Sequence, residues 1–230
     1  MRLRGLLFTL LLVSAAQAQQ GFPFTNESLR YSIDYTSGLS LGEAVFTATH
    51  STAGWTFEAT VNAAVPGFAI SDTLRGSATN DLCSTEFSRD LSNGSKKTRE
   101  KMTFDEKTGK AHRVTTLPSE GGETTFTIPS CARDALTYVY FGRRELGQGR
   151  VPHPQEVFFG NAYSTKMEYL GPQNLIVKDK HTVTDHLVIS VKGPKSDFSF
   201  EVFYARDAAR TPVEIRIPAP AGTLTAKLSQ

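Results

Sequence analysis

Hydrophobic and polar residues alternate with a period of two along most of the chain from Leu29 onward. Successive side chains of an extended chain point to opposite faces, so this alternation predicts strands with one packed face and one solvated face, as antiparallel sheets have. The runs between turn signals predict about a dozen short strands in a meander, a sandwich or a barrel. The apolar positions of the clearest runs are Leu29, Tyr31, Ile33 and Tyr35; Trp55, Phe57, Ala59 and Val61; Leu187, Ile189 and Val191; and Phe198, Phe200, Val202 and Tyr204.

Pairs that contain glycine or proline separate these runs. Asn93-Gly94, Thr108-Gly109 and Gly121-Gly122 each offer a residue that tolerates positive φ, and they predict hairpin turns. Gly171-Pro172, Gly193-Pro194 and residues 220–222 predict breaks in the second half of the chain. Neither an internal repeat nor a low-complexity linker interrupts the pattern, so a single β-rich domain over residues 19–230 is expected.

One segment departs from the period of two. Ser130 is a good helix cap, and it predicts a helix near residues 131–142 that begins at about Cys131 and is ended by Gly142. A single amphipathic helix in a β-rich chain is expected to pack against a sheet. The residues that form its apolar face at helical spacing are Ala135, Leu136, Val139 and Tyr140.

The N-terminus has the layout of a secretory signal peptide over residues 1–18. Arg2 and Arg4 precede an apolar run over residues 6–13, and Ala16-Gln17-Ala18 supplies a cleavage site of the small-x-small type. We expect cleavage near Ala18 and a mature protein that is periplasmic or secreted. No second apolar run is long enough to cross a membrane, and no cysteine follows the cleavage point to carry a lipid anchor.

Loss of the signal peptide changes the balance of charge. The full chain has 25 Lys and Arg residues against 23 Asp and Glu residues. Arg2 and Arg4 lie in the signal peptide, which has no acidic residue, so 23 basic and 23 acidic residues remain. Proteins that bind nucleic acids gather a basic excess on one face, so this balance argues against a nucleic-acid partner.

Cys83 and Cys131 are the two cysteines of the chain. An even number of cysteines outside the cytosol favours a disulfide between them, which stabilises the fold by about 4 kcal/mol in the chain-entropy account. The alternative is two free thiols or a redox pair. Their wide separation and the lack of a C-x-x-C motif disfavour that alternative.

The residues that usually carry chemistry do not form a recognisable site. His181 and His186 lie in a predicted strand at an odd spacing, so they point to opposite faces and cannot share a metal ion. The chain has no G-x-S-x-G, H-E-x-x-H, P-loop or Rossmann signature. We therefore expect no metal, no cofactor and no catalytic residue, and a hydrolase site assembled from distant strands stays open as the least favoured function.

A basic run follows the Asn93-Gly94 turn and consists of Lys96, Lys97, Arg99 and Lys101. Lysines on an edge strand prevent pairing with other chains, and the acidic residues nearby favour this interpretation. The alternative is contact with anionic lipid head groups or with a partner.

Aromatic residues are abundant, with 15 Phe and 7 Tyr. Two interpretations stay open: an ordinary packed core, or a concave apolar cavity that holds a lipophilic ligand, as incompletely filled barrels do. The residues expected to line such a cavity are Tyr31, Tyr35, Phe57, Phe68, Tyr138 and Phe141.

Five short motifs follow one another along the chain: residues 29–35 (LRYSIDY), 40–44 (SLGEA), 133–141 (RDALTYVYF), 210–215 (RTPVEI) and 222–224 (GTL). In this order they resemble domain-of-unknown-function family 3108, a family of bacterial exported proteins, over about residues 29–228. The resemblance implies a curved antiparallel sheet partly wrapped around a helix. That fold is similar to the LolA/LolB-like lipoprotein carriers, half-barrels whose concave face holds acyl chains. No functional residue carries over.

The expected fold is therefore mainly β, with a single curved antiparallel sheet or half-barrel and one packed helix. The expected function is an exported protein that binds a lipophilic small molecule or an envelope lipid in a concave cavity. The alternative is a non-enzymatic scaffolding protein of the envelope that contacts another envelope component.

Overall fold

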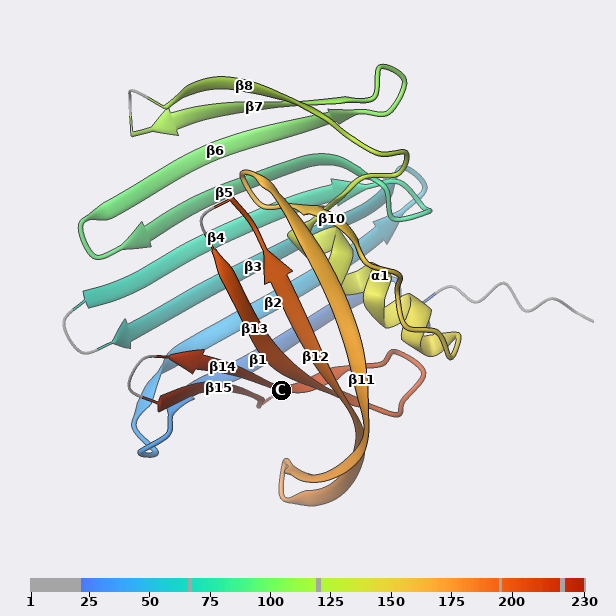
Figure 1. Ribbon diagram of the computed structural model, residues 1–230. Helices are drawn as coiled ribbons and strands as arrows, with labels where there is room; N and C mark the ends of the chain where they lie inside the picture. The colour runs from blue at the N-terminus through green and yellow to red at the C-terminus, as the bar shows by residue number, and fades with distance from the viewer. Residues whose placement is uncertain (1–21, 66–67, 119–120, 195, 220–221, 230) are drawn as a thin grey trace, which may run out of the picture.

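The computed structural model describes residues 22–65, 68–118, 121–194, 196–219 and 222–229. The predicted signal peptide and its cleavage site lie outside these residues. Within them the chain forms one sheet of 15 strands and one helix, α1 (Ala135–Gly147) (Figure 1). The predicted mainly β fold is confirmed, but the sheet has 15 strands rather than about a dozen. One of the added strands, β9, has only two residues, too few for any periodicity to reveal.

The strands form two runs, one on each side of α1 in the sequence. Before the helix come β1 (Asn26–Tyr35), β2 (Ser40–Ser51), β3 (Gly54–Val65), β4 (Phe68–Ala78), β5 (Ser84–Asn93), β6 (Lys96–Asp105), β7 (Lys110–Leu117), β8 (Gly122–Thr127) and β9 (Arg133–Asp134). After it come β10 (Gln155–Phe158), β11 (Ala162–Val177), β12 (Lys180–Lys192), β13 (Asp197–Ala205), β14 (Pro212–Ala219) and β15 (Gly222–Leu228).

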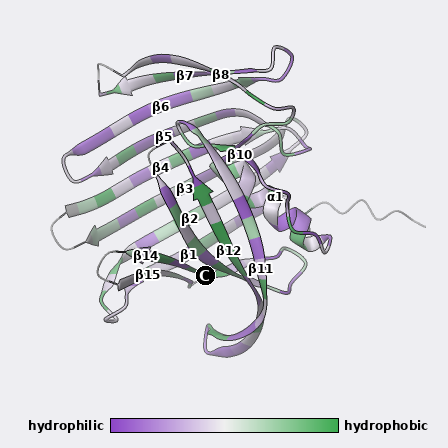
Figure 2. Cartoon of the chain, viewed as in Figure 1, coloured by the Kyte–Doolittle hydropathy of each residue, from purple (hydrophilic) through white to green (hydrophobic). Residues whose placement is uncertain are grey.

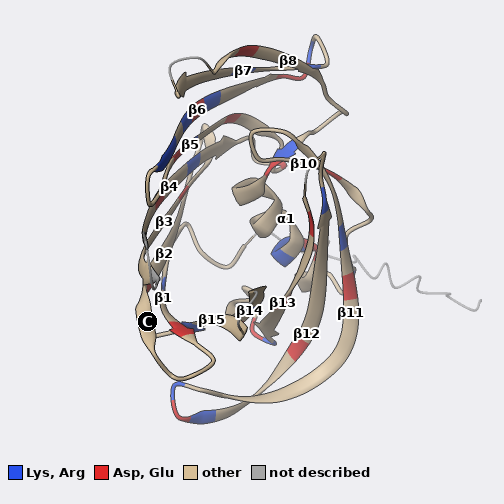
Figure 3. Ribbon diagram, turned by 60° about the vertical axis from the view of Figure 1, so that its left-hand side comes forward, with Lys and Arg blue, Asp and Glu red and all other residues tan. Residues whose placement is uncertain are grey.

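Neighbouring strands in the sheet are mostly neighbours in the sequence. Strands β1 to β8 lie side by side in chain order, as do β9 to β15, and β1 pairs with β15 to join the two runs. The β9–β10 pair is parallel, and the other pairs are antiparallel. The sheet curls around α1, so that β11–β13 lie across the helix from β2–β5 (Figures 1 and 3). The sheet therefore has an inner face toward the helix and an outer face toward solvent.

The alternation in the sequence decides which residues occupy the inner face. Hydrophilic and hydrophobic residues alternate in bands along several strands (Figure 2). Directly opposed residues of paired strands share a face, and Tyr31 opposes Ala44, which opposes Val61. Tyr31 and Ala44 are buried. The same parity continues along each strand, so the predicted apolar positions are those that face the helix.

The predicted turns are found at most of the expected positions. Gly94, Gly109 and Gly122 all have positive φ at or beside strand ends. The break predicted at Gly171-Pro172 is wrong, because both residues lie inside β11, at a bulge after Tyr169. Strand β10 pairs only with residues 162–165 of β11, so beyond that point β11 has a partner on one side only and can accommodate a proline.

The helix begins and ends later than the sequence predicts. Residues Arg133 and Asp134 pair as β9 with β10, so the chain stays extended until Asp134 caps the helix by accepting from the N–H groups of Leu136 and Thr137. Ser130 is therefore not the cap. Gly142 lies inside the helix because Met167 of β11 packs against it: an added Cβ would lie 2.7 Å from the Met167 Cε.

The disulfide between Cys83 and Cys131 is present, as predicted. It joins the segment before β5 to the segment before β9, where the Ser84 N–H also donates to the Ala132 carbonyl at 2.9 Å. The main core lies close by, between α1 and the inner face of β2–β5. There the Phe57 ring stacks on the Tyr140 ring at a centroid distance of 4.4 Å.

Candidate functional site

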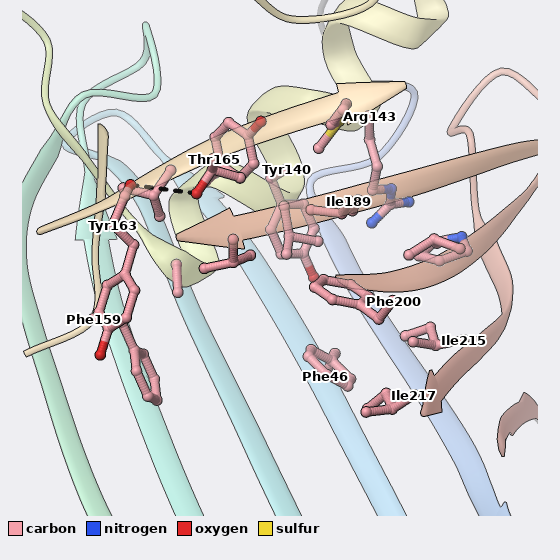
Figure 4. Close-up of a pocket in the computed structure, with 18 of the residues that line it drawn as sticks. Phe46, Tyr140, Arg143, Phe159, Tyr163, Thr165, Ile189, Phe200, Ile215 and Ile217 are labelled. Atoms are coloured by element: carbon pink, nitrogen blue, oxygen red, sulfur yellow. Dashed lines mark hydrogen bonds between the residues drawn. The ribbon is translucent and has the colours of Figure 1, made fainter. Parts of the chain in front are cut away.

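A cavity of about 470 Å³ lies beside α1 on the inner face of the sheet (Figure 4). Its walls come from α1, from β1 and β2 on one side, and from β10 to β14 on the other. A volume of several hundred cubic ångströms is the size of small-molecule sites in proteins. The curl of the sheet therefore leaves a space that side chains fill only in part.

The C-terminal strands line the cavity because their inward parity is apolar. Met167 on β11 opposes Ile189 on β12, which opposes Phe200 on β13. On the next pair, Val202 of β13 opposes Ile215 of β14. All five belong to the lining, so a ladder of cross-strand apolar neighbours forms one wall.

The helix side of the cavity carries one charged group. Of the described lining residues, Arg143 alone has a charged side chain, and it is only 1% exposed. It forms two hydrogen bonds with the Glu27 carboxylate, at 2.6 and 2.7 Å, and its Nε donates to the carbonyls of Ala209 and Arg210. Burial lowers the pKa of the guanidinium, but Glu27 outweighs burial and raises its pKa overall. The guanidinium therefore stays charged, and the Glu27 carboxylate pairs with that charge.

Four buried tyrosines also line the cavity: Tyr31, Tyr138, Tyr140 and Tyr204. The Tyr31 hydroxyl donates to the Pro212 carbonyl at 2.7 Å. Burial raises the pKa of all four phenols, that of Tyr204 to about 12. They stay protonated at neutral pH, so the wall they form adds no net charge to the cavity.

Apolar residues at the rim are open to solvent. Phe198 of β13 and Ile217 of β14 belong to the lining, and they are 47% and 42% exposed. Tyr163 packs at the same rim against the β12–β13 turn, where a Cβ added to Gly193 would lie 2.3 Å from its ring. The cavity is thus a hydrocarbon-like space with an apolar mouth.

The structure brings together some of the residues expected to form a cavity. Tyr31 and Tyr138 are part of the lining. Phe57 lies in the adjoining core against Tyr140. Phe141 lies under the Arg133 guanidinium, whose Cζ is 3.6 Å from the centre of the Phe141 ring. Tyr35 lies at the end of β1, beside Gly222. Phe68 begins β4, and its side chain lies outside the described part of the structure.

Sequence reasoning missed most of the cavity wall. Phe46, Phe159, Tyr163 and the inward residues of β11, β12 and β14 are part of the lining. The alternation of Leu187, Ile189 and Val191 in β12 predicts that these three residues share a face. It does not show which strands oppose the helix at a distance that leaves space.

The other candidate residues do not form a chemical site in the described part of the chain. No three of its His, Cys, Asp and Glu residues come close enough together to hold a metal ion. The basic run does not lie on an edge strand, because β6 pairs with β5 on one side and β7 on the other. Its side chains form cross-strand ion pairs instead: Arg99 pairs with Asp90 at 2.7 Å and Lys101 with Glu86 at 2.8 Å. No described helix combines the length and hydropathy needed to span a bilayer.

A solved structure shares the fold at very low sequence identity. A β-barrel-like protein of domain-of-unknown-function family 1849 from Brucella abortus matches 91% of this chain and 98% of its own, with a TM-score of 0.65 and 10% identity. A putative exported protein with a YmcC-like fold from Bacteroides fragilis covers 90% of this chain and 94% of its own, with a TM-score of 0.36 and 6% identity. A comparison with curated proteins gives no match.

The family model described as protein of unknown function DUF3108 matches residues 30–229. The match covers β2 to β15, residues 30–35 of β1 and both cysteines. It agrees with the resemblance carried by the five motifs. The chain belongs to the DUF3108 family.

Proposed function

We propose that this protein binds a lipophilic molecule in the cavity beside α1, outside the cytosol. The observation that supports this function most is the chemistry of the wall: apolar side chains from both halves of the sheet meet there around space that they do not fill. The wall has no unpaired charge among its described residues, because Arg143 is neutralised by Glu27.

Hydrocarbon gains free energy when it enters such a space. Each CH₂ group that leaves water contributes about 0.8 kcal/mol. A chain of ten such groups therefore gains roughly 8 kcal/mol before the costs of association. The exposed rim residues Phe198 and Ile217 extend the apolar surface to the mouth, where a ligand would enter.

The disulfide supports the location outside the cytosol. Disulfides persist in oxidising compartments and are rare in the reducing cytosol. The Cys83–Cys131 bridge joins two segments of the fold near the start of the helix, where it restrains one end of the cavity wall. This location also agrees with the predicted signal peptide.

The test is to measure binding of a fluorescent fatty-acid analogue to the mature protein. Val191 lines the cavity and is half-buried, so Val191→Trp fills part of the space. Ser190 is the neighbouring exposed residue on the outer face of β12, so Ser190→Trp is the matched control. We expect Val191→Trp to weaken binding at least tenfold and the control to leave it unchanged. Absence of binding to the wild-type protein would favour a scaffolding role instead.

A further inference from the structure

A carboxylate lies on the inner face of the sheet, outside the lining of the cavity. Asp72 of β4 shares its parity with Leu74, which packs on the core, and with Gly76, which faces the buried Asp134. It opposes Val61 on β3 and Leu91 on β5. Asp72 is therefore a half-buried acid on an otherwise apolar part of the concave face.

Two other acids of this face have cationic partners, whereas Asp72 has none among the described residues. Glu27 pairs with Arg143 at 2.6 Å, and Glu100 pairs with Arg89 at 2.6 Å. Among the described residues, Asp72 accepts only from the Ser92 N–H, at 3.0 Å, and from the Asn93 amide, at 3.4 Å. Burial raises the pKa of its carboxyl group, and no cation nearby offsets that cost.

The sheet register gives the distance from this carboxylate to the cavity. Phe46 of the lining opposes Ala59, which opposes Leu74 of β4. Asp72 is one same-face step along β4 from Leu74. Two strand spacings and one such step place Asp72 about 12 Å from Phe46, since strands lie about 4.8 Å apart and same-face residues about 6.8 Å apart. A molecule that spans this distance reaches both.

We propose that Asp72 is a head-group subsite, which pairs with the protonated amine of an amphiphile whose hydrocarbon chain occupies the cavity. The subsite rests on the proposed function, because the hydrocarbon chain of the ligand provides the binding in the cavity. The amine provides the selectivity among head groups. Charge-assisted hydrogen bonds to a carboxylate are about twice as strong as neutral ones, so an amine is preferred to an uncharged head group of the same size. A carboxylate head group is disfavoured by repulsion from Asp72.

Three probes with the same chain separate head group from tail: dodecylamine, dodecanol and dodecanoate. Each displaces the fluorescent fatty-acid analogue from the mature protein at neutral pH. We expect dodecylamine to bind about tenfold more tightly than dodecanol, and dodecanoate more weakly than either. Asp72→Asn keeps an oxygen that accepts from the Ser92 N–H, so we expect it to remove the preference for the amine and to leave dodecanol unchanged.

Two further variants test whether the preference for the amine depends on a negative charge at position 72. Asp72→Glu keeps the charge and is expected to keep part of the preference. Asp90 is an exposed acid of β5 that pairs with Arg99 on the outer face, so Asp90→Asn removes the same charge at a distance and should leave the preference intact. Equal binding of amine and alcohol, or a preference that survives Asp72→Asn, would overturn the subsite alone. If no probe binds, or if Val191→Trp weakens none of them, the proposed function fails and the subsite with it.

Discussion

The inner face of the sheet differs sharply between its two ends. On β11–β14 the inward residues are apolar and leave a cavity, as Ile189, Phe200 and Ile215 show. On β5–β7 the inward positions include Arg89, Glu100 and Arg113, which are partly or fully withdrawn from solvent. The alternation is the same at both ends, so the difference lies in the chemistry of the inward residues.

Polar residues of β5 and β7 contact the turn between β10 and β11, and this turn also borders the cavity. Arg113 donates to the carbonyl of Gly160 and to the side chain of Asn161, and Arg89 lies over the Phe159 ring at 4.6 Å. Residues 159–161 form the turn between β10 and β11, and Phe159 is part of the cavity lining. A buried polar cluster at one end of the sheet thus fixes one wall of the apolar cavity at the other end.

The largest effect is expected when the polar end loses one partner of its ion pair. Arg89→Met leaves Glu100 without its partner, although that carboxylate is only 9% exposed. Removing one partner of a buried pair costs about 3–5 kcal/mol in the free energy of unfolding. Urea unfolding measures this loss. Arg75→Met breaks the exposed pair with Glu58 and is expected to cost less than about 1 kcal/mol; equal losses would show that the two pairs are equivalent.

The core and the cavity wall should respond differently to removal of a phenylalanine. Phe87 is buried in the main core, and Phe87→Ala is expected to cost about 3–5 kcal/mol in the free energy of unfolding. Phe200 borders the cavity and is half-buried, so Phe200→Ala should cost clearly less, about 1–2 kcal/mol. Chemical denaturation of both variants checks this order, and a larger cost for Phe200 would indicate a wall that is as tightly packed as the core.

The turn that links the two ends can be tested with a glycine substitution. Gly160 has a φ of +74°, and a Cβ there would lie within 3 Å of the Arg89 guanidinium and the Glu100 carboxylate. Gly160→Ala is expected to destabilise the fold by about 1–3 kcal/mol and to weaken probe binding through Phe159. Gly149 has the same φ with open space around it, so Gly149→Ala isolates the backbone cost and should leave binding unchanged.

The smallest effect is expected on the outer face. Asp90 and Arg99 are exposed, and such pairs contribute about 0–1 kcal/mol. Asp90→Asn should change the free energy of unfolding by less than about 0.5 kcal/mol, with no change in probe binding. A larger change, measured by urea unfolding at low and high salt, would show that the outer face also carries structural ion pairs.

Much of the fold follows from local patterns. Alternation predicts the strands, and glycine positions predict several turns. An even number of cysteines behind a predicted signal peptide predicts the disulfide. Each of these predictions depends on nearby residues or on a simple count. The helix boundaries depend on distant contacts: β9 pairing delays the start until the Asp134 cap, and Gly142 inside the helix leaves room for Met167 of β11. Local sequence contains neither contact, so the predicted start at Cys131 and end at Gly142 are wrong.

The cavity depends even more on distant contacts. Tyr31 and Tyr138 were expected in it and line it, whereas Phe57 lies in the core and Phe141 lies under Arg133. Tyr31 and Phe57 lie at inward positions that the alternation reveals, whereas Tyr138 and Phe141 lie outside the apolar face predicted for the helix. Whether an inward residue meets a partner or an empty space depends on how far the sheet curls around α1, and no short stretch of sequence sets that distance.

We claim that the cavity binds a lipophilic molecule, and native mass spectrometry of the mature protein can show the bound molecule itself. The protein is purified gently from the extracytoplasmic fraction, beside Val191→Trp and Ser190→Trp. We predict an added mass that organic solvent removes, present in the wild-type protein and in Ser190→Trp and reduced in Val191→Trp. A bare polypeptide mass for the wild-type protein that also takes up no fatty-acid analogue would contradict the claim.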